Sequence, residues 1–158
     1  MGGIMFHIVM HEPEIPYNTG NIARTCVLTN TALHLIRPLG FQLDEKKIKR
    51  AGMDYWPLVN IKLHDSFEVF LKQEQPERIF MATTKANHRY DQAEYKDGDY
   101  IMFGKESRGI PEDILAEYHN MTIRIPMEDT MGRSLNVCNS VNVILYEALK
   151  QNNFPGLR

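Results

Sequence analysis

The sequence predicts an α/β fold in which a parallel sheet carries helices on both faces. Short apolar runs recur along the 158 residues, with stretches of helical composition between most of them. Apolar runs of roughly four to eight residues are typical of buried strands. Strands that alternate with helices pair in parallel through right-handed crossovers, so that helices cover both faces of the sheet.

The elements follow each other in a strand–helix order. The predicted strands are Met5–Met10, Leu33–Ile36, Leu58–Ile61, Arg78–Ala82, Tyr100–Phe103 and Met121–Ile125. The predicted helices are Gly20–Thr29, Asp44–Ala51, Ser66–Glu74, Pro111–Glu117 and Leu135–Gln151. Asp44 and Ser66 are suitable caps, and Pro111 suits a first helical turn. Because ligands of such sheets bind at the carboxyl ends of strands, we expect the site there.

Length and composition indicate one domain over residues 1–158. The net charge of −2 excludes a general basic field for nucleic acid, so any RNA contact must be local. No apolar run reaches the ~20 residues of a membrane span, and no cleavable leader is apparent, which indicates a cytoplasmic protein without membrane contact. Residues 1–3 resemble an expression-vector remnant. Cys26 and Cys138 are expected to be buried, reduced thiols.

The last predicted helix, Leu135–Gln151, is apolar around nearly its whole circumference. Such a helix is buried nearly all round. Since a small domain has few wholly internal helices, we expect part of its surface to face a second subunit in a two-fold homodimer. The alternative is a helix in the centre of the core.

Three polar, glycine-bearing segments follow predicted strands. In the first, residues 18–24, Gly20 permits a close approach, and Asn18 or Asn21 can cap a helix or bind a ligand. Arg24 is placed near the predicted helix N-terminus, where a cation opposes the helix dipole, which suggests an anionic partner such as an RNA phosphate. The alternative is a solvated Arg24.

The second segment, residues 103–111, has the sequence FGKESRGIP. Its backbone amides can cradle a polar ligand, but it matches neither GxGxxG nor GxxxxGK[ST], which argues against a Rossmann dinucleotide site or a nucleotide triphosphatase. Glu106 is either a site residue or a surface partner of Lys105 and Arg108.

The third segment, residues 125–137, is a long polar loop that leads into the last helix. Ser134 is a good candidate for the helix N-cap. Asn136, Asn139 and Asn142 form helices poorly, so any of them that is buried needs a hydrogen-bond partner.

Other groups carry less weight. His7 and His11 lie four residues apart within a predicted strand, where that spacing does not present a metal pair, so we expect no metal. Residues 44–52, and the group Lys85, His88 and Arg89, can either grip phosphates or form solvated surfaces. No motif indicates a hydrolase.

The three segments together resemble the motifs of the SPOUT superfamily of RNA 2′-O-methyltransferases. The stretches HEPEIPYNTGNIAR, AGMDYW, FGKESRGIP and SLNVCNSVNVILYEALKQ are similar to the subgroup that methylates the wobble nucleotide, C or U at position 34, of leucine tRNAs. The resemblance runs from Ile8 to about Gly156. Because this subgroup consists of minimal single domains, it favours the tRNA anticodon stem-loop over rRNA. Methylation of rRNA and a non-catalytic RNA-binding dimer remain the alternatives.

The resemblance implies a C-terminal deep trefoil knot within residues 78–153, an obligate homodimer and S-adenosylmethionine as methyl donor, with no metal. The implied cofactor-binding residues are Ala82, Thr83, Gly104, Glu106, Gly109, Ile125, Met127, Ser134, Leu135 and Asn136. The implied catalytic residues are Arg24, Asn18, Glu106, Ser134 and Asn136.

In this superfamily the residue that matches Arg24 is proposed to activate the 2′-hydroxyl. A guanidinium stays charged in proteins and is a poor base, so we expect Arg24 to hold the adjacent phosphate and to stabilise the developing oxyanion. Tyr146 can contact the second subunit or RNA, or pack in the core.

Overall fold

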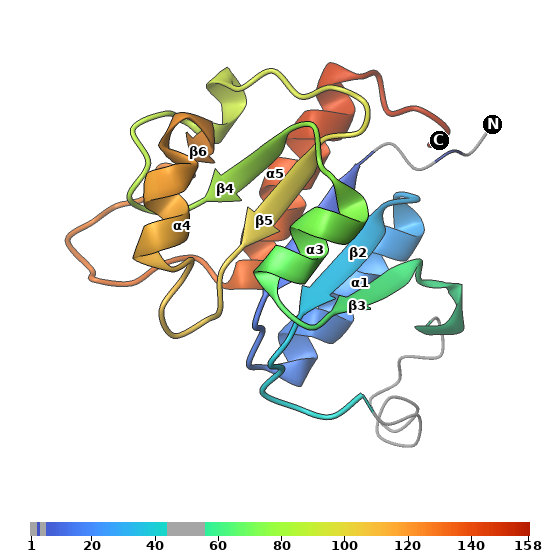
Figure 1. Cartoon of the computed structure of the whole chain (residues 1–158). Helices are drawn as coiled ribbons and strands as arrows, with labels where there is room; N and C mark the ends of the chain where they lie inside the picture. The colour runs from blue at the N-terminus through green and yellow to red at the C-terminus, as the bar shows by residue number, and fades with distance from the viewer. Residues whose placement is uncertain (1–2, 4–5, 44–55) are drawn as a thin grey trace.

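The computed structural model describes residues 3, 6–43 and 56–158, and its strands form one parallel sheet in the order β3-β2-β1-β5-β4-β6 (Figure 1). The strands are β1 (His7–His11), β2 (Ala32–Ile36), β3 (Ile61–His64), β4 (Ile79–Ala82), β5 (Tyr100–Phe103) and β6 (Thr122–Ile123). The α-helices are α1 (Pro16–Leu28), α3 (Phe67–Glu74), α4 (Glu112–Glu117) and α5 (Val137–Gln151). Short 3-10 helices span Trp56–Leu58, Tyr90–Gln92 and His119–Met121. The expected α/β fold with a parallel sheet is confirmed.

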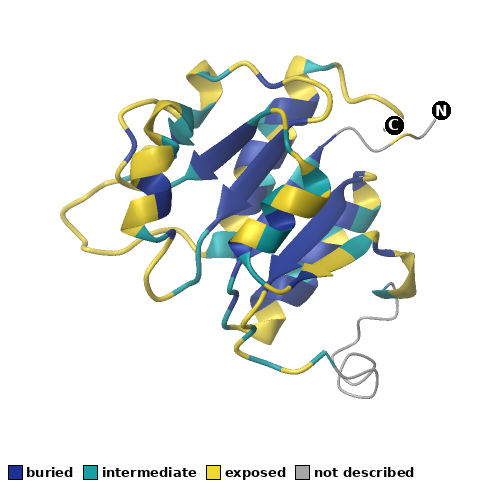
Figure 2. Ribbon diagram, in the orientation of Figure 1, coloured by how far each residue is buried: buried dark blue, intermediate teal, exposed yellow. Residues whose placement is uncertain are grey.

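Helices cover both faces of the sheet, because successive strand residues point to opposite sides. Ile8 and Met10 of β1 pack in a core that includes residues of α1 and α5, whereas Val9 packs in a second core with residues of α3 and α4. Figure 1 shows α3 in front of the sheet, with α1 and α5 behind it. Strands β1, β2, β4 and β5 are buried almost throughout, as parallel strands between two helical layers should be, whereas the edge strand β3 is partly exposed (Figure 2).

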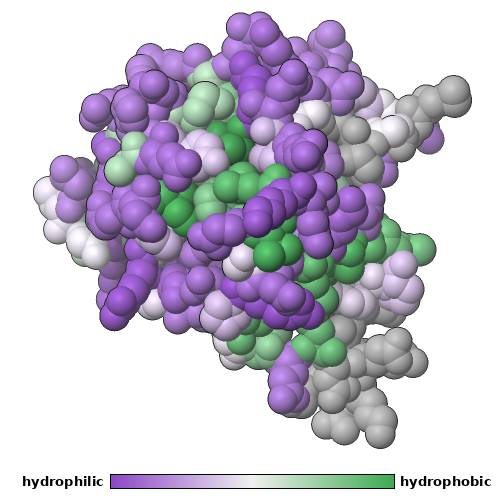
Figure 3. Space-filling model, in the orientation of Figure 1, coloured by the Kyte–Doolittle hydropathy of each residue, from purple (hydrophilic) through white to green (hydrophobic). Residues whose placement is uncertain are grey.

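The face that carries α3 is mostly hydrophilic at its surface, with hydrophobic residues mainly near the middle of the view (Figure 3). Helix α3 begins where the sequence predicts, because the Ser66 hydroxyl accepts a hydrogen bond from the backbone N–H of Val69 at 3.1 Å. Helix α4 begins one residue later than predicted, with Pro111 as the residue before it.

Two predicted strands and the first predicted helix have wrong boundaries. The strand expected at Leu58–Ile61 is β3, Ile61–His64, because Leu58 ends a 3-10 helix. The last strand is only Thr122–Ile123. Helix α1 begins at Pro16, four residues before the predicted Gly20, since proline is suited to the first helical position. The predicted helix Asp44–Ala51, its cap Asp44 and the basic group 44–52 lie outside the described residues, as do residues 1–2 and most of the AGMDYW stretch.

Within the single chain, helix α5 is buried along one face and exposed along another, and the expected contact with a second subunit stays a prediction. Its inner face, including Val141 and Leu145, is fully buried, but Val143 is 36% and Tyr146 44% exposed. The core-packing interpretation of Tyr146 is therefore wrong for the single chain. Apolar side chains on an exposed helix face leave room for a partner surface.

Cys26 and Cys138 are both buried free cysteines, as expected. Burial raises the pKa of the Cys26 thiol far above its ordinary value. Within the described part of the chain, no helix has the length and apolar character needed to span a bilayer.

Candidate active site

A cavity of about 600 Å³ opens at the carboxyl ends of β4, β5 and β6. It lies where the α/β rule places ligands. All ten residues implied as cofactor-binding line it: Ala82, Thr83, Gly104, Glu106, Gly109, Ile125, Met127, Ser134, Leu135 and Asn136. The structure thus brings together side chains from three segments far apart in the sequence.

The loop between β5 and α4 is a tight turn closed on itself. The backbone N–H of Gly109 donates to the carbonyl of Lys105 at 2.8 Å, and Gly109 has a φ of +74°, which favours glycine. A Cβ on Gly104 would lie 2.0 Å from the carbonyl carbon of Gly109. Only glycine fits at Gly104, so the loop can turn back over the end of β5.

Glu106 holds this loop against the segment that precedes α1. Its carboxylate accepts hydrogen bonds from the backbone N–H groups of Glu14 at 3.1 Å and Ile15 at 2.8 Å. In return, the Glu14 carboxylate accepts from the backbone N–H of Ser107 at 2.9 Å. We call this reciprocal pair the Glu14–Glu106 clasp. The ion-pair interpretation of Glu106 is wrong, since Lys105 pairs instead with Glu12 at 3.2 Å.

The two carboxylates of the clasp differ in electrostatic environment. Burial raises the pKa of Glu106 above its ordinary value, although the N–H groups of Glu14 and Ile15 partly oppose this. Hydrogen bonds from the side chain and backbone of Ser107 lower the pKa of Glu14. An ionised Glu106 with its oxygens on backbone amides is suited to positioning the loop. Glu14 and Ser107 were missed from the sequence, because only the fold brings residues 14 and 107 together.

Asn136 connects the start of α5 with α1. It is the N-cap of α5, and its Oδ1 accepts from the backbone N–H of Cys138 at 2.8 Å. Its Nδ2 donates to Oδ1 of Asn18, a buried residue of α1, at 2.9 Å. The prediction of Ser134 as the N-cap is wrong, because α5 starts two residues after Leu135; Ser134 instead lines the cavity. Asn142 of α5 accepts a hydrogen bond from the hydroxyl of Thr25, a residue of α1, at 2.6 Å.

Arg24 lies in a second cavity of about 510 Å³ between α1 and the start of α5. Because α1 begins at Pro16, Arg24 is in its third turn, and the argument from the helix N-terminus was wrong. The exposed Arg24 shares this cavity with Asn139 and Asn142. Asn18 and Asn136 line both cavities, so their hydrogen bond marks the place where the two meet.

The residues of the predicted basic group, Lys85, His88 and Arg89, do not share one site. Lys85 pairs with Glu112, and Arg89 pairs with Asp91 at 2.9 Å. Lys85 and His88 line a third cavity of about 400 Å³ beside the first. Three further basic residues line the first cavity itself: Lys105, Arg108 and Arg133. Basic side chains therefore lie at both openings, and those of Lys85 and Lys105 are paired with carboxylates.

Known proteins resemble the chain over nearly its whole length. The model of the SpoU rRNA Methylase family matches residues 5–146. The tRNA (cytidine(34)-2'-O)-methyltransferase of Escherichia coli (strain K12) is 46% identical over 153 residues, covering 96% of this chain and 97% of that enzyme.

Solved structures agree. A structure from work on the 2-OH methylation of C/U34 on tRNA has a TM-score of 0.88 and 46% identity, and the match covers 95% of this chain and 97% of that one. The AdoMet-bound rRNA methyltransferase from Sinorhizobium meliloti, with a TM-score of 0.80, is only 21% identical and supports the fold alone; the match covers 95% of this chain and 57% of that one. The chain belongs to the SpoU methylase family, within the group of tRNA (cytidine(34)-2'-O)-methyltransferases.

Proposed function

We propose that this chain transfers a methyl group from S-adenosylmethionine to the 2′-hydroxyl of nucleotide 34, a C or U, in leucine tRNAs. The observation that carries the proposal is the junction of two cavities at Asn18 and Asn136. One cavity contains every residue implied as cofactor-binding, and the other contains Arg24. Relatives about 46% identical are tRNA (cytidine(34)-2'-O)-methyltransferases, which supports this choice of substrate.

The first cavity fits the methyl donor. Its volume lies in the range of small-molecule sites. Apolar side chains such as Ile123 and Ile144 suit an adenine ring, and polar groups such as Thr83 and Ser134 suit its hydrogen-bonding edges and the amino acid part. When bound, S-adenosylmethionine supplies an electrophilic methyl group. Gly104, Glu106 and Gly109 line the same space, because the absence of a side chain at Gly104 lets the turn fold back against the end of β5.

The second cavity is suited to the nucleotide. A charged guanidinium binds phosphate bidentately and stabilises a developing oxyanion, so Arg24 orients the ribose and lowers the barrier to attack by its 2′-oxygen. The hydroxyl proton passes to a phosphate oxygen or water, since a guanidinium is a poor base. Asn18 and Asn136, fixed by their mutual hydrogen bond, hold polar atoms between the two cavities. Glu106 and Ser134 support the cofactor side of the junction.

We further propose that residues 1–158 are one domain, that residues 78–153 contain the superfamily's trefoil knot, and that the enzyme is a cytoplasmic homodimer. The strand order supports a threaded chain, because β5 lies between β1 and the earlier strand β4. The exposed apolar residues Leu28, Val143 and Tyr146 of α1 and α5 support a dimer surface near the Arg24 cavity. The methyl transfer itself requires no metal.

Radiolabelled methyl transfer to purified tRNA and to rRNA tests the substrate, with nuclease mapping of the labelled nucleotide. We expect label on the ribose of nucleotide 34, and highest rates with leucine tRNA transcripts. Label on rRNA alone would contradict the substrate. Absence of both label and S-adenosylmethionine binding by calorimetry would leave the non-catalytic RNA-binding dimer.

A further inference from the structure

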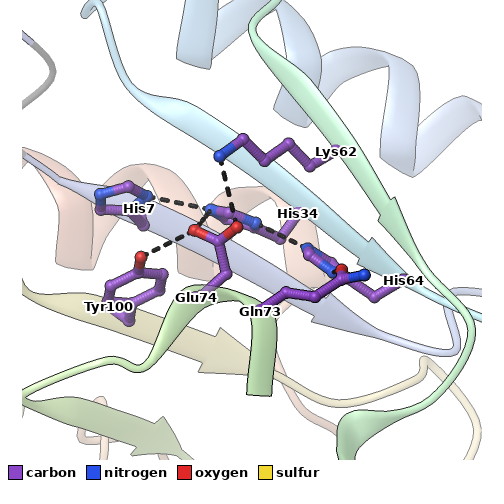
Figure 4. A network of polar contacts seen from close by, with 7 residues as sticks. All are labelled: His7, His34, Lys62, His64, Gln73, Glu74 and Tyr100. Atoms are coloured by element: carbon purple, nitrogen blue, oxygen red, sulfur yellow. Dashed lines mark hydrogen bonds and ion pairs between the residues drawn. The ribbon is translucent and has the colours of Figure 1, made fainter. Parts of the chain in front are cut away.

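Seven polar side chains meet on the α3 face of the sheet, from His7 and Tyr100 at the amino ends of β1 and β5 to His64 at the end of β3 (Figure 4). We call them the histidine cluster: His7, His34, Lys62, His64, Gln73, Glu74 and Tyr100. The candidate active site lies at the carboxyl ends of β4, β5 and β6, at the other end of the strands. None of the seven lines either cavity of that site. The histidine cluster therefore has no role in the methyl transfer proposed above.

The three histidines form a chain of hydrogen bonds. Nδ1 of His7 lies 2.9 Å from Nε2 of His34, and Nδ1 of His34 lies 3.0 Å from Nε2 of His64. Nδ1 of His64 lies 2.9 Å from Oε1 of Gln73, which can only accept a hydrogen bond. His64 therefore carries its proton on Nδ1, and His34 in turn carries its proton on Nδ1. The lone pair of His34 Nε2 then points toward His7 and Glu74.

We propose that His7, His34 and Glu74 bind a divalent transition metal, with Zn²⁺ as the best-suited ion. Nδ1 of His7, Nε2 of His34 and a carboxylate oxygen of Glu74 all lie within 4.8 Å of one another. Two imidazole nitrogens and one carboxylate form a known zinc ligand set, with a water in the fourth position. Figure 4 shows the His7 ring and the Glu74 carboxylate both directed toward His34.

The spacing suits such an ion after small side-chain shifts. Metal–ligand bonds of about 2.0–2.2 Å in a tetrahedron place ligand atoms roughly 3.3 Å apart. The His7–His34 separation of 2.9 Å must open slightly, and the 3.9 Å between His34 Nε2 and Glu74 Oε1 must shorten. When the ion binds, the His7 proton moves from Nδ1 to Nε2 through solvent. Both imidazoles stay neutral, and two N–metal bonds and one O–metal bond replace one hydrogen bond.

The groups that surround these ligands are already placed as an outer shell. Metal-bound histidines donate their second N–H to a fixed acceptor, and His34 does so to His64. The Tyr100 hydroxyl donates to Oε1 of Glu74 at 2.9 Å, and Lys62 binds the other oxygen, Oε2, at 3.3 Å. Lys62 thus leaves a lone pair of Oε1 for the metal. Its side chain is 52% exposed and can move outward as the ion enters.

Such an ion would join α3 to the sheet. Glu74 belongs to the last turn of α3, whereas His7 and His34 belong to β1 and β2. The buried His34 and the partly exposed His7 form the inner and outer sides of the site. We therefore expect the ion to stabilise the fold and to leave the rate of methyl transfer unchanged.

Calorimetric titration of untagged protein, freed of metal with EDTA and dialysed, with ZnCl₂ tests the proposal. Wild type and His119→Gln, whose exposed imidazole contacts only the carbonyl of Ala116 among the bonds described, should bind one zinc per chain at this site. His7→Gln and Glu74→Gln should bind it at least ~10–100-fold more weakly. Zinc at 100 times its Kd should raise the Tm of wild type by on the order of 5 °C.

A cobalt titration and an activity assay complete the test. Tetrahedral Co²⁺ should give a visible absorption band in wild type and not in His7→Gln. His7→Gln should retain methyl transfer, which shows that it has folded. Absence of zinc binding in wild type, or equal zinc affinity in wild type and a folded His7→Gln, would overturn the metal site and leave a purely structural hydrogen-bond network.

Discussion

The two polar regions of this sheet are held in opposite ways. At the carboxyl ends of the strands, side chains such as Glu106 and Asn136 bind backbone amides, and a cavity of about 600 Å³ lies beside them. In the histidine cluster, side chains bind each other and pack edge-on against the Phe70 ring, whose centroid is 5.5 Å from that of His34. The side chains at the carboxyl ends of the strands hold loops around an open cavity, whereas those of the histidine cluster pack between α3 and the sheet.

This difference predicts which substitutions should change activity and which should change stability. A side chain that projects into a cavity can be removed at little cost to the fold, but its loss changes chemistry. A side chain that fixes a loop or a helix start affects both. We therefore expect effects on activity and on stability to separate across the two regions, and the following changes test that separation.

Arg24→Ala should give the largest effect on activity. Loss of transition-state positioning and charge stabilisation should lower the rate of methyl transfer by about 10²–10⁴-fold. Because Arg24 is exposed, the free energy of unfolding should change by no more than about 0.5 kcal/mol. Single-turnover methyl transfer and urea unfolding measure the two quantities.

The matched control for Arg24 is Arg37→Ala, which removes an exposed arginine that is paired with Asp65 and lines neither cavity. It should leave the rate unchanged. Equal losses in the two variants would show that Arg24 acts only through general charge, and Arg24→Lys would then be fully active.

Gly104→Ala should lower stability and cofactor affinity together. The new Cβ would lie 2.0 Å from Gly109 and 2.2 Å from the nitrogen of Ile110, so the turn must shift. Overpacking of this kind costs about 1–3 kcal/mol. Thermal unfolding and calorimetric titration with S-adenosylhomocysteine measure both losses; normal ligand affinity in the folded variant would mean that the turn does not shape the cavity.

Asn136→Ala should destabilise the enzyme by about 1 kcal/mol, because α5 loses its N-cap. It also loses the hydrogen bond to Asn18. Asn136→Ser keeps a capping oxygen but has no amide N–H to donate. We expect Asn136→Ser to recover stability in urea unfolding without recovering methyl transfer; recovery of both would assign Asn136 a capping role only.

Glu14→Ala should have the smallest effect, a several-fold increase in the KM for S-adenosylmethionine with little change in kcat. It removes the acceptor for Ser107, but Glu106 still binds the backbone amides of residues 14 and 15. Glu117→Ala, which removes an exposed carboxylate of α4, is the control. A lower kcat at unchanged KM would mean that the clasp acts on the reaction step and not on cofactor binding.

Most of the fold follows from the sequence because buried strands and helices have distinct periods. The mistakes have local causes. Leu58 and Val59 form an apolar pair that imitates a strand, although the pairing partner of Leu33 is Ile61. Helix α1 begins at Pro16, whereas the predicted helix began at Gly20. The prediction therefore placed Arg24 too close to the helix N-terminus, and the argument from the helix dipole was wrong.

The polar segments 103–111 and 125–137 of the first cavity were recognised from the sequence as site candidates, but only the family resemblance named the individual cofactor-binding residues. The Glu14–Glu106 clasp and the histidine cluster were not found at all. Their members are ordinary in the sequence: His34 stands in an apolar strand, and His7 was compared with His11 instead. Only the strand order sets His7, His34 and His64 on adjacent strands of one face.

The most direct test of the two-cavity account is a crystal structure with S-adenosylhomocysteine and an anticodon stem-loop. We expect the cofactor product in the cavity lined by Gly104 and Ser134, and the ribose of nucleotide 34 beside Arg24, with Asn18 and Asn136 between them. Binding of S-adenosylhomocysteine elsewhere, or of nucleotide 34 away from Arg24, would contradict the account.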